Sequence, residues 1–242
     1  NQVWDKLRLR RESFTYNQKS QVAKINSPLG STNLYNINVN AENLFKLKQG
    51  FQMSAELKSE YKVFRKIIKD LDLDVLVLEG LDGEIDGKLN FYYDKDNKGF
   101  DYGFVGNLNK FSYNKISKIK DFPIVLDRFN GNINFSKKTL LISGVGLLNE
   151  SLSNIDLSIN PKNMMNLKIK SDAMHSSFNF LGKYNFITGG NVKLNLNITR
   201  DISSKNWKAK VDANLFENNI FITALNYNKN KNKRAKMTAE FS

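Results

Sequence analysis

Apolar and polar residues alternate one by one through most of this chain. The segment 190–200, GNVKLNLNITR, is a clear example, with one polar residue between each pair of aliphatic ones: Val192, Leu194, Leu196 and Ile198. Successive side chains of a β-strand point to opposite faces of its sheet, so this period predicts a strand with one apolar and one polar face. If other parts of the protein cover this apolar face, it belongs to a core; if they leave it open, it is a binding surface.

The same period recurs along the chain and predicts roughly ten to twelve short strands, mostly joined by turns. Polar hairpins are expected at DKDNKG (94–99) and NKNKNKR (228–234). A length of 242 residues suffices for one large β domain or two small ones. The fold class is therefore mainly β, with alternating rows in these segments: 35–39, 89–93, 100–104, 133–135, 155–159, 167–169, 207–215 and 235–241.

One segment has a different period. Residues 54–73, SAELKSEYKVFRKIIKDLDL, carry apolar side chains at helical spacing and predict an amphipathic helix that Ser54 or Ser59 caps. A shorter helical turn is expected within 40–50, where a glycine ends it. Residues 114–124 read as a connection.

A glycine precedes four of the alternating runs. We expect each of these glycines to lie in a sharp turn just before a strand. Their irregular spacing excludes a strict solenoid period. The four segments are GKLNF (87–91), GNLNKF (106–111), GNINF (131–135) and GNVKLNL (190–196).

Composition narrows the classes of function. The chain has no cysteine, which excludes a disulfide framework and thiolate metal sites. Its formal net charge of +13 favours an anionic partner, although the abundance of Lys, Asn, Ile and Phe is equally the signature of an AT-rich genome. No window approaches the roughly 20 apolar residues of a membrane span. Both ends of the sequence read as cut, so we expect a piece of a longer protein.

Signals of catalysis are weak. His175 is the only histidine, and its neighbours Asp172 and Ser176 do not form a nucleophile elbow. The carboxylates of the segment 82–86 alternate with other residues and predict an acidic, solvated strand face. Most aromatic residues lie in the apolar register, which disfavours stacking on nucleic acid. We therefore expect no enzyme, cofactor, metal site or nucleic-acid partner.

Residues 81–170 resemble the AsmA-like envelope proteins of the YhdP and TamB type. The similarity lies in LDGEIDGKLNFYYDKDNKGFDY (81–102) and in FSYNKISKIKDFPIVLDRFNGNINFSKKTLLISGVGLLNESLSNIDLSI (111–159). Gly-bounded strands, a polar link to a proline and a G-x-I-x-F strand follow one another there in that family's order. YNFITGGNVKLNLNITR (184–200) and WKAKVDANLFENNIFI (207–222) look like two further units.

The resemblance implies a long, strongly curved antiparallel sheet that forms an open apolar groove, a β-taco, with one amphipathic helix near residues 54–73. Residues 1–242 would be one continuous groove segment: strands and the helix in 1–80, the best family match in 81–170, and further groove strands in 171–242. The implied function is non-enzymatic: phospholipid acyl chains move along the groove between the inner and outer membranes. The implied location is the periplasm, with an inner-membrane anchor in a part of the protein absent here and a contact with the outer membrane.

Under this interpretation, alternate residues of successive strands line the groove. Two alternatives remain open: a structural or adhesive β-sandwich or solenoid module with a dry core, and a binder of an anionic polymer. Each expected lining residue is equally suited to an ordinary core. These residues are Leu89, Phe91, Phe104, Ile133, Phe135, Ile155, Leu157, Leu167, Ile169, Val192, Leu194, Leu196, Ile198 and Val211.

Overall fold

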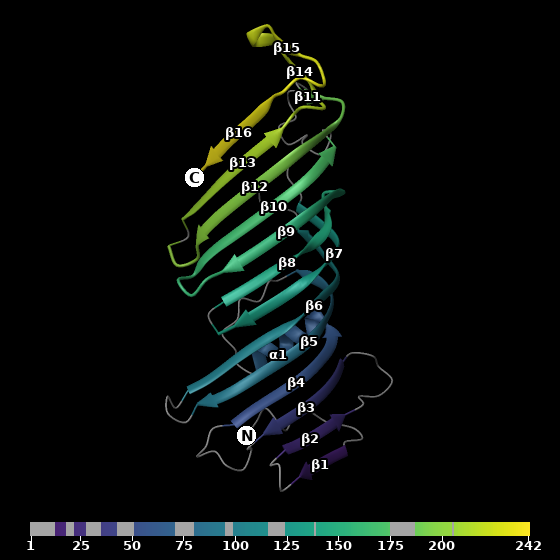
Figure 1. The fold of residues 1–242 in the computed structure, drawn as a ribbon, viewed down its shortest axis with the longest axis vertical. Coiled ribbons are helices and arrows are strands. Elements are labelled where there is room, and N and C mark those ends of the chain that lie inside the picture. The colour runs from purple at the N-terminus through teal and green to yellow at the C-terminus, as the bar shows by residue number, and fades with distance from the viewer. Residues whose placement is uncertain are drawn as a thin grey trace. The chain divides into compact units, whose positions relative to one another are not determined.

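The structure, a computed structural model, describes residues 13–17, 22–27, 35–42, 51–70, 80–94, 99–115, 124–137, 139–174, 187–204 and 206–242. These residues form a mainly β protein, as the alternation predicts, with one short α-helix (Figure 1). A large antiparallel sheet has the strand order β1-β2-β3-β4-β5-β6-β7-β8-β9-β10-β12-β13-β16, and β11-β14-β15 form a three-stranded sheet.

The order of strands in the large sheet follows the chain, so most neighbours in the sheet are also neighbours in sequence. The strands are β1 Ser13–Asn17, β2 Val22–Ser27, β3 Tyr35–Glu42, β4 Phe51–Glu60, β5 Leu81–Asp94, β6 Gly99–Lys115, β7 Ile124–Ser136, β8 Thr139–Leu148, β9 Ser151–Ile159, β10 Met164–Met174, β11 Ile187–Thr188, β12 Asn191–Asp201, β13 Trp207–Asn214, β14 Asn219–Ile222, β15 Tyr227–Lys229 and β16 Lys236–Phe241. The helices are α1 Tyr61–Asp70 and the 3-10 turn Thr223–Leu225.

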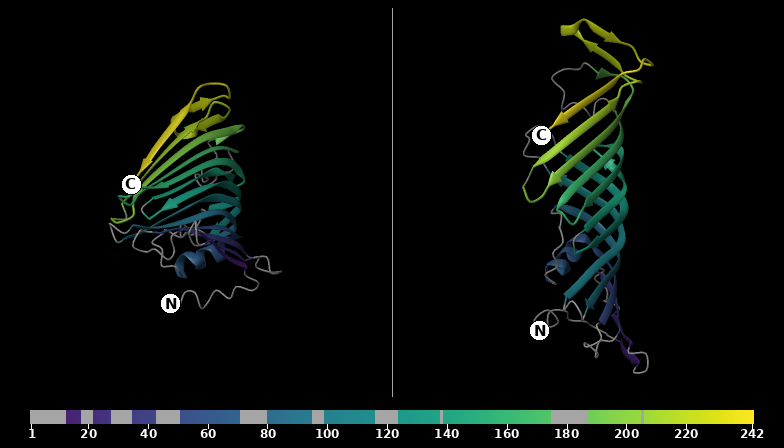
Figure 2. Two further views of the ribbon diagram at one scale, coloured as in Figure 1. Left: turned by 60° about the horizontal axis from the view of Figure 1, so that its bottom comes forward. Right: turned by 60° about the vertical axis from the view of Figure 1, so that its left-hand side comes forward.

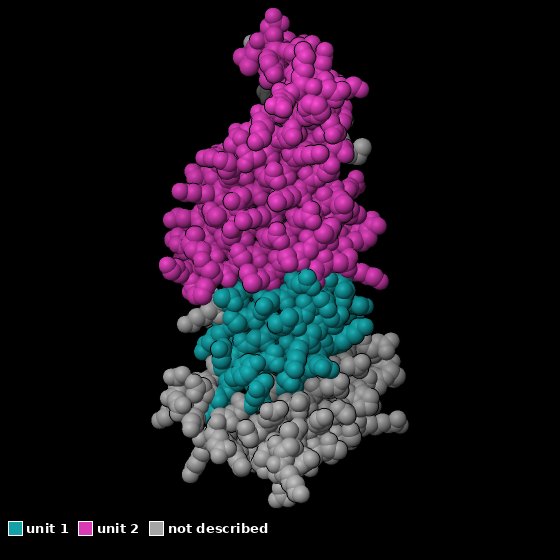
Figure 3. Space-filling model, viewed as in Figure 1, with its two compact units in different colours: residues 1–109, 132–140 teal, residues 110–131, 141–242 magenta. Residues whose placement is uncertain are grey.

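The chain divides into two compact units (Figure 3). Unit 1 comprises residues 1–109 and 132–140, and unit 2 comprises residues 110–131 and 141–242. Each unit has buried apolar side chains of its own.

In unit 1, α1 packs on the apolar side of the sheet. The pairing of β4 with β5 places Leu57 opposite Gly87 and Ala55 opposite Leu89. The Phe64 ring of α1 lies 5.1 Å from the Phe104 ring and 6.2 Å from the Phe135 ring, measured between centroids. These side chains exclude water from a core whose members are Leu57, Tyr61, Phe64, Ile68, Ile85, Leu89, Tyr102, Phe104, Leu108, Ile133, Phe135 and Leu140.

The predicted helix over 54–73 is wrong in its first part. Residues 51–60 form β4, and the helix begins at Tyr61, so neither Ser54 nor Ser59 caps it. The apolar residues from Leu57 onward fit both periods, and the pairing of β4 with β3 and β5 decides for a strand. Likewise, β3 extends to Glu42 where a helical turn was predicted, and residues 43–50, 71–73 and 116–123 lie outside the described residues.

Three of the four repeated glycines lie inside strands, which corrects the prediction that each precedes one. Gly87, Gly106 and Gly131 lie within β5, β6 and β7. Only Gly190 precedes its strand, β12. Its φ of +70° is in the left-handed region, and a side chain there would meet the Glu217 carbonyl.

Close approach of neighbouring strands explains all three strand-interior glycines: Gly87 lies against Gly106, and Gly131 lies against Gly144. In unit 1, the Phe104 ring occupies the space that side chains at Gly87 and Gly106 would need, 2.6 and 2.7 Å from their Cβ positions. In unit 2, the Phe129 ring does the same at Gly131 and Gly144, at 2.8 and 2.7 Å. Each unit thus contains a Phe-x-Gly segment whose ring covers a cross-strand pair of glycines.

Candidate functional site

In unit 2, the register aligns apolar side chains in rows that cross five strands. In the first row, Leu167 pairs with Leu157 and with Ile198, which pairs with Ala209, which pairs with Phe241. Residues two positions along each strand form the next row, on the same side of the sheet. This second row consists of Ile155, Ile169, Leu196, Val211 and Ala239. We call this side of the strands β9, β10, β12, β13 and β16 the apolar face.

The opposite side, here called the polar face, carries charged and amide side chains in the same strands. One of its rows runs Asp156, Lys168, Asn197, Lys210 and Glu240. The exposed or partly exposed polar residues of its central rows are Lys168, Lys170, Lys193, Asn195, Asn197, Lys208, Lys210 and Asp212. The two faces of these strands therefore differ sharply in polarity. Figure 2 draws the strands next to one another in the large sheet.

Most side chains of the apolar face remain partly accessible to solvent. Leu157, Leu167, Leu196 and Ile198 are only half-buried. They are more accessible than fully packed core side chains such as Phe104 of unit 1, which is 0% exposed, and Phe111 of unit 2, which is 1% exposed. Apolar side chains in ordered rows that water still reaches form a surface suited to an apolar ligand or partner.

One end of the apolar face is covered by protein. There Val192 and Ala213, both 2% exposed, pack with Ile220 of β14 in the three-stranded sheet. Partly buried side chains around this cluster are Ile187, Leu194, Ile222, Ala235 and Met237. The accessible part of the apolar face therefore begins beyond Leu194 and continues through the rows of Leu196 and Ile198.

Arg200 and Trp207 pair at the other end of the face. Arg200 is exposed and Trp207 is 47% exposed, so a cation and an amphipathic ring lie beside the last apolar row. Beyond them, the Asp201 carboxylate accepts hydrogen bonds from the Ser203 and Ser204 N–H groups and the Ser204 hydroxyl. The hydrogen bond from the Ser204 hydroxyl is the largest cause that lowers the pKa of Asp201.

The structure distributes the fourteen expected lining residues over both units. Val192, Leu194, Leu196 and Ile198 do lie on one face of β12, and the residues between them are exposed or point to the other face, as the alternation predicts. The unit 2 members share the apolar face: Ile155, Leu157, Leu167, Ile169, Val192, Leu194, Leu196, Ile198 and Val211. The unit 1 members are Leu89, Phe104, Ile133 and Phe135, which are buried in the core of unit 1, and Phe91, which is half-buried.

Several members of the apolar face were not among the expected lining residues. The register adds Met165, Ala209 and Trp207 to its rows. Their alternation with lysines and asparagines was the signal that could have identified them. Ala209 belongs to the alternating run 207–215 and is buried at 8% exposure.

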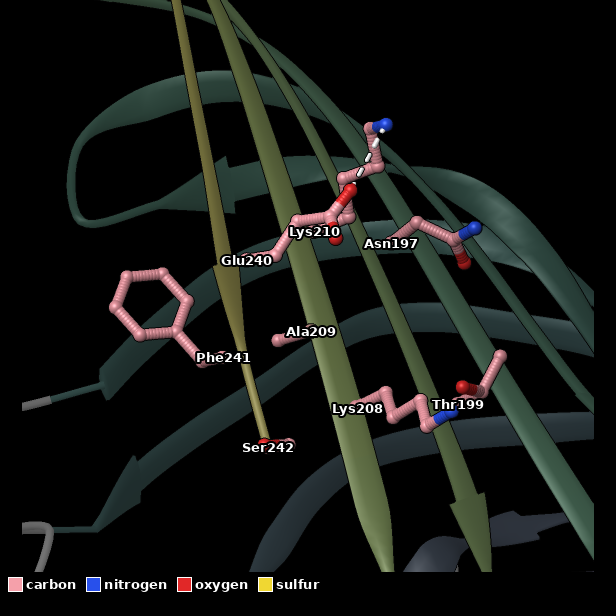
Figure 4. Close-up of a pocket in the computed structure, with 8 residues that line it drawn as sticks. All are labelled: Asn197, Thr199, Lys208, Ala209, Lys210, Glu240, Phe241 and Ser242. Carbon is pink, nitrogen blue, oxygen red and sulfur yellow. Dashed lines mark ion pairs between the residues drawn. The ribbon is translucent and has the colours of Figure 1, made fainter.

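A depression of about 410 Å³ lies at β12, β13 and β16, and its lining includes Ala209 and Phe241 of the apolar face as well as residues of the polar face (Figure 4). The Lys210 ammonium lies 3.1 Å from the Glu240 carboxylate, and the hydrogen bond to Glu240 raises the pKa of Lys210. Lys208 lies alongside Thr199 in Figure 4. The charged and amide side chains that line the depression are Lys208, Lys210, Glu240 and Asn197.

The acidic segment in β5 has the solvated face that its spacing predicts. Asp82 and Glu84 are exposed, and Asp86 accepts hydrogen bonds from the Asn107 and Asn109 side-chain amides at 2.8 and 2.9 Å. Within the described ranges, no three His, Cys, Asp or Glu side chains are grouped so that they could hold a metal ion. His175 lies outside the described residues.

The polar hairpin expected at 228–234 is only partly exposed. Lys231, Lys233 and Arg234 face solvent, but Lys229 is 3% exposed and its ammonium donates to the carbonyl oxygens of Leu215 and Asn218, both at 2.6 Å. The sequence does not distinguish this buried lysine from the exposed Lys231 and Lys233, which follow it in the same Asn-Lys pattern.

The comparisons with known proteins give no relative. No family model matches the chain, and no curated protein and no solved structure matches it. Among the helices of the described residues, none is both long and apolar enough to span a membrane.

Proposed function

We propose that this chain is a non-enzymatic, lipid-binding and lipid-conducting module of a bacterial envelope protein. The observation that carries the proposal is the apolar face of unit 2, whose rows are continuous over five strands and still partly accessible to solvent. Each methylene of an acyl chain that leaves water against such a face contributes about 0.8 kcal/mol. A chain of lipid length therefore gains several kcal/mol without any specific polar contact.

In this proposal the sheet is strongly curved and forms an open groove, with acyl chains against the apolar face and the polar face in water. Two residues with left-handed backbone support a local bend. Lys110 in β6 has a φ of 54° and Arg128 in β7 has a φ of 49°. The Lys110 N–H donates to the Asn130 side chain at 3.0 Å, so the two irregular positions are close together. Irregularities of this kind bend strands and increase their twist.

The resemblance to AsmA-like proteins supports the same proposal and extends it. By that similarity the module is periplasmic, is tethered to the inner membrane by another part of the protein, and passes phospholipid towards the outer membrane. The apolar rows are similar to one another, so no row binds an acyl chain much more tightly than the next. This similarity favours movement of a lipid along the sheet.

The decisive experiment introduces a charge into the middle of the apolar face. Leu196→Asp is expected to abolish co-purification of phospholipid with the 242-residue chain, as measured by mass spectrometry of the extracted lipid. Asn197→Asp, next in β12 but on the polar face, is the matched control and is expected to retain lipid. Circular dichroism establishes whether each variant keeps its β structure.

A second readout does not depend on a destabilising substitution. Trp207 lies at the end of the apolar rows, and Trp4→Phe leaves it as the only tryptophan in the chain. Phospholipid with brominated acyl chains is expected to quench Trp207 fluorescence. Absence of both quenching and co-purified lipid would overturn the proposal.

The second candidate is a structural module with a dry core. The observation in its favour is unit 1, where α1 packs against Phe104 and Phe135 and leaves both rings 0–1% exposed. For this candidate, no lipid accompanies the purified chain and Leu196→Asp lowers stability without changing the lipid content.

A further inference from the structure

The three-stranded sheet of unit 2 presents large apolar side chains to solvent. We call residues 216–234 the hairpin tip, which includes β14, the 3-10 turn and β15. Figure 1 and Figure 2 draw β14 and β15 beyond the end of β12 and β13. The exposed fractions in the tip are 42% for Phe216, 56% for Phe221, 73% for Leu225 and 44% for Tyr227.

Strand pairing and hydrogen bonds hold the backbone that carries these exposed side chains. In the β14–β15 pair, Ile220 is opposite Lys229 and Phe221 is opposite Asn228. The turn between them closes at Asn226, whose backbone is left-handed and whose N–H donates to the Thr223 carbonyl at 3.1 Å. Since Ile220 is buried in the unit 2 core, the neighbouring Phe221 is held on the outer side of the small sheet.

A basic turn lies against the same tip. Lys231, Lys233 and Arg234 are exposed. The Asn232 N–H donates to the Phe216 carbonyl at 2.7 Å, and the Lys231 N–H donates to the Asn219 side chain at 2.8 Å. These bonds hold the backbone of the basic turn beside Phe216, and Glu217 is the one acidic residue within the tip sequence.

We propose that the hairpin tip docks on the surface of an anionic lipid bilayer. Phe, Leu and Tyr side chains enter the boundary between headgroups and acyl chains, and adjacent Lys and Arg side chains gain from the negative surface potential of anionic lipids. The tip combines both within one segment, and its charge is complementary to such a surface. The proposal concerns an intact bilayer and stands apart from the binding of single lipid chains to the apolar face.

The first test removes the exposed apolar side chains. The double variant Phe221→Ser/Leu225→Ser is compared with the unsubstituted 242-residue chain by co-sedimentation with vesicles of phosphatidylcholine and phosphatidylglycerol. We expect about a tenfold or larger loss of vesicle affinity. The matched control, Leu141→Ser/Leu152→Ser, removes side chains that are 52% and 63% exposed elsewhere in unit 2 and is expected to bind as before.

The second test removes charge. Lys231→Gln/Lys233→Gln/Arg234→Gln is expected to weaken binding to the anionic vesicles about tenfold or more, and to reduce the dependence of binding on salt. The control, Lys168→Gln/Lys170→Gln/Lys193→Gln, removes the same charge from exposed positions of the polar face. It is expected to lose far less affinity.

Three outcomes would overturn the proposal. Equal losses in the tip and control variants would mean general electrostatic attraction, and unchanged binding in both tip variants would exclude the tip. Self-association that disappears in Phe221→Ser/Leu225→Ser, without any vesicle binding, would assign the patch to a second copy of the chain. Leu196→Asp separates the two proposals, because it is expected to abolish co-purified lipid and to leave vesicle docking intact.

Discussion

Gly131 and Gly144 approach each other across neighbouring strands so closely that a Cβ on either would meet the backbone of the other. The Phe129 ring fills the space over the pair, 2.7–2.8 Å from both Cβ positions. Gly87, Gly106 and Phe104 repeat the arrangement in unit 1. The glycines thus serve close packing of a ring on the backbone, and their conformational freedom matters only at positions such as Gly190.

Gly144→Ala should therefore destabilise unit 2 by about 1–3 kcal/mol, because the new methyl group must displace backbone of β7 or the Phe129 ring. Urea denaturation followed by circular dichroism measures the effect. Val145→Ala in the same strand is the control, since Val145 is 41% exposed and should change stability little. A Gly144→Ala protein as stable as the control would contradict this packing.

Lys229 is the second residue whose role is local. Its buried ammonium satisfies the carbonyl oxygens of Leu215 and Asn218, and so joins β15 to the turn between β13 and β14. Lys229→Met keeps the length of the side chain but removes the donor to both carbonyl oxygens. The Leu215 oxygen still accepts from the Asn218 N–H, whereas the Asn218 carbonyl loses its bond to the ammonium, at a cost of about 1–3 kcal/mol. Thermal unfolding should register the loss, whereas Lys231→Met, at an exposed position, should be nearly neutral.

At the scale of elements, the sequence predicts strands more reliably than the boundary between a strand and a helix. Leu57 belongs to a period of two within β4 and to a helical period with Tyr61 and Phe64. The pattern within this segment cannot decide between them, because the decision comes from pairing with other segments, β3 and β5. In α1, the part of the segment that is a helix, the spacing of the apolar residues fits a helical period and not a period of two.

The buried ring of α1 should dominate the stability of unit 1. Phe64→Ala removes contacts with Phe104 and Phe135, and should cost about 3–5 kcal/mol. Lys62→Ala is the control, since Lys62 is exposed and its ion pair with Glu60 is worth little. Denaturant titration monitored by α-helical circular dichroism compares the two. A loss below about 1 kcal/mol in Phe64→Ala would mean that α1 is not the cover of this core.

The composition of each face was predictable from alternation, but its burial was not. The pattern around Leu89 in β5 is the same as the pattern around Leu196 in β12. The structure buries Leu89 to 4% exposure and leaves Leu196 half-buried. Which face receives a cover depends on where α1 and the three-stranded sheet pack, and alternation within one strand carries no information about other elements.

At the scale of the whole molecule, the two units differ in how accessible their apolar side chains are to a lipid. In unit 1 the rings that an acyl chain would contact are occupied by α1. In unit 2 the rows of Leu196 and Ile198 are partly open, although Ile169 and Ala209 within them are buried, and the end near Val192 is covered. Under the proposed function, acyl chains should therefore bind unit 2 in preference to unit 1.

Hydrogen exchange measures this difference over the whole chain. A ligand that binds only the folded state stabilises the elements it contacts, and slows their amide exchange accordingly. Adding phospholipid to delipidated protein should slow exchange in β9, β10, β12 and β13 and leave α1 unchanged. Leu196→Asp serves as the control, in which lipid should protect neither region. Equal protection of α1 and β12 would mean that the lipid stabilises the molecule as a whole, and would contradict binding at the apolar face.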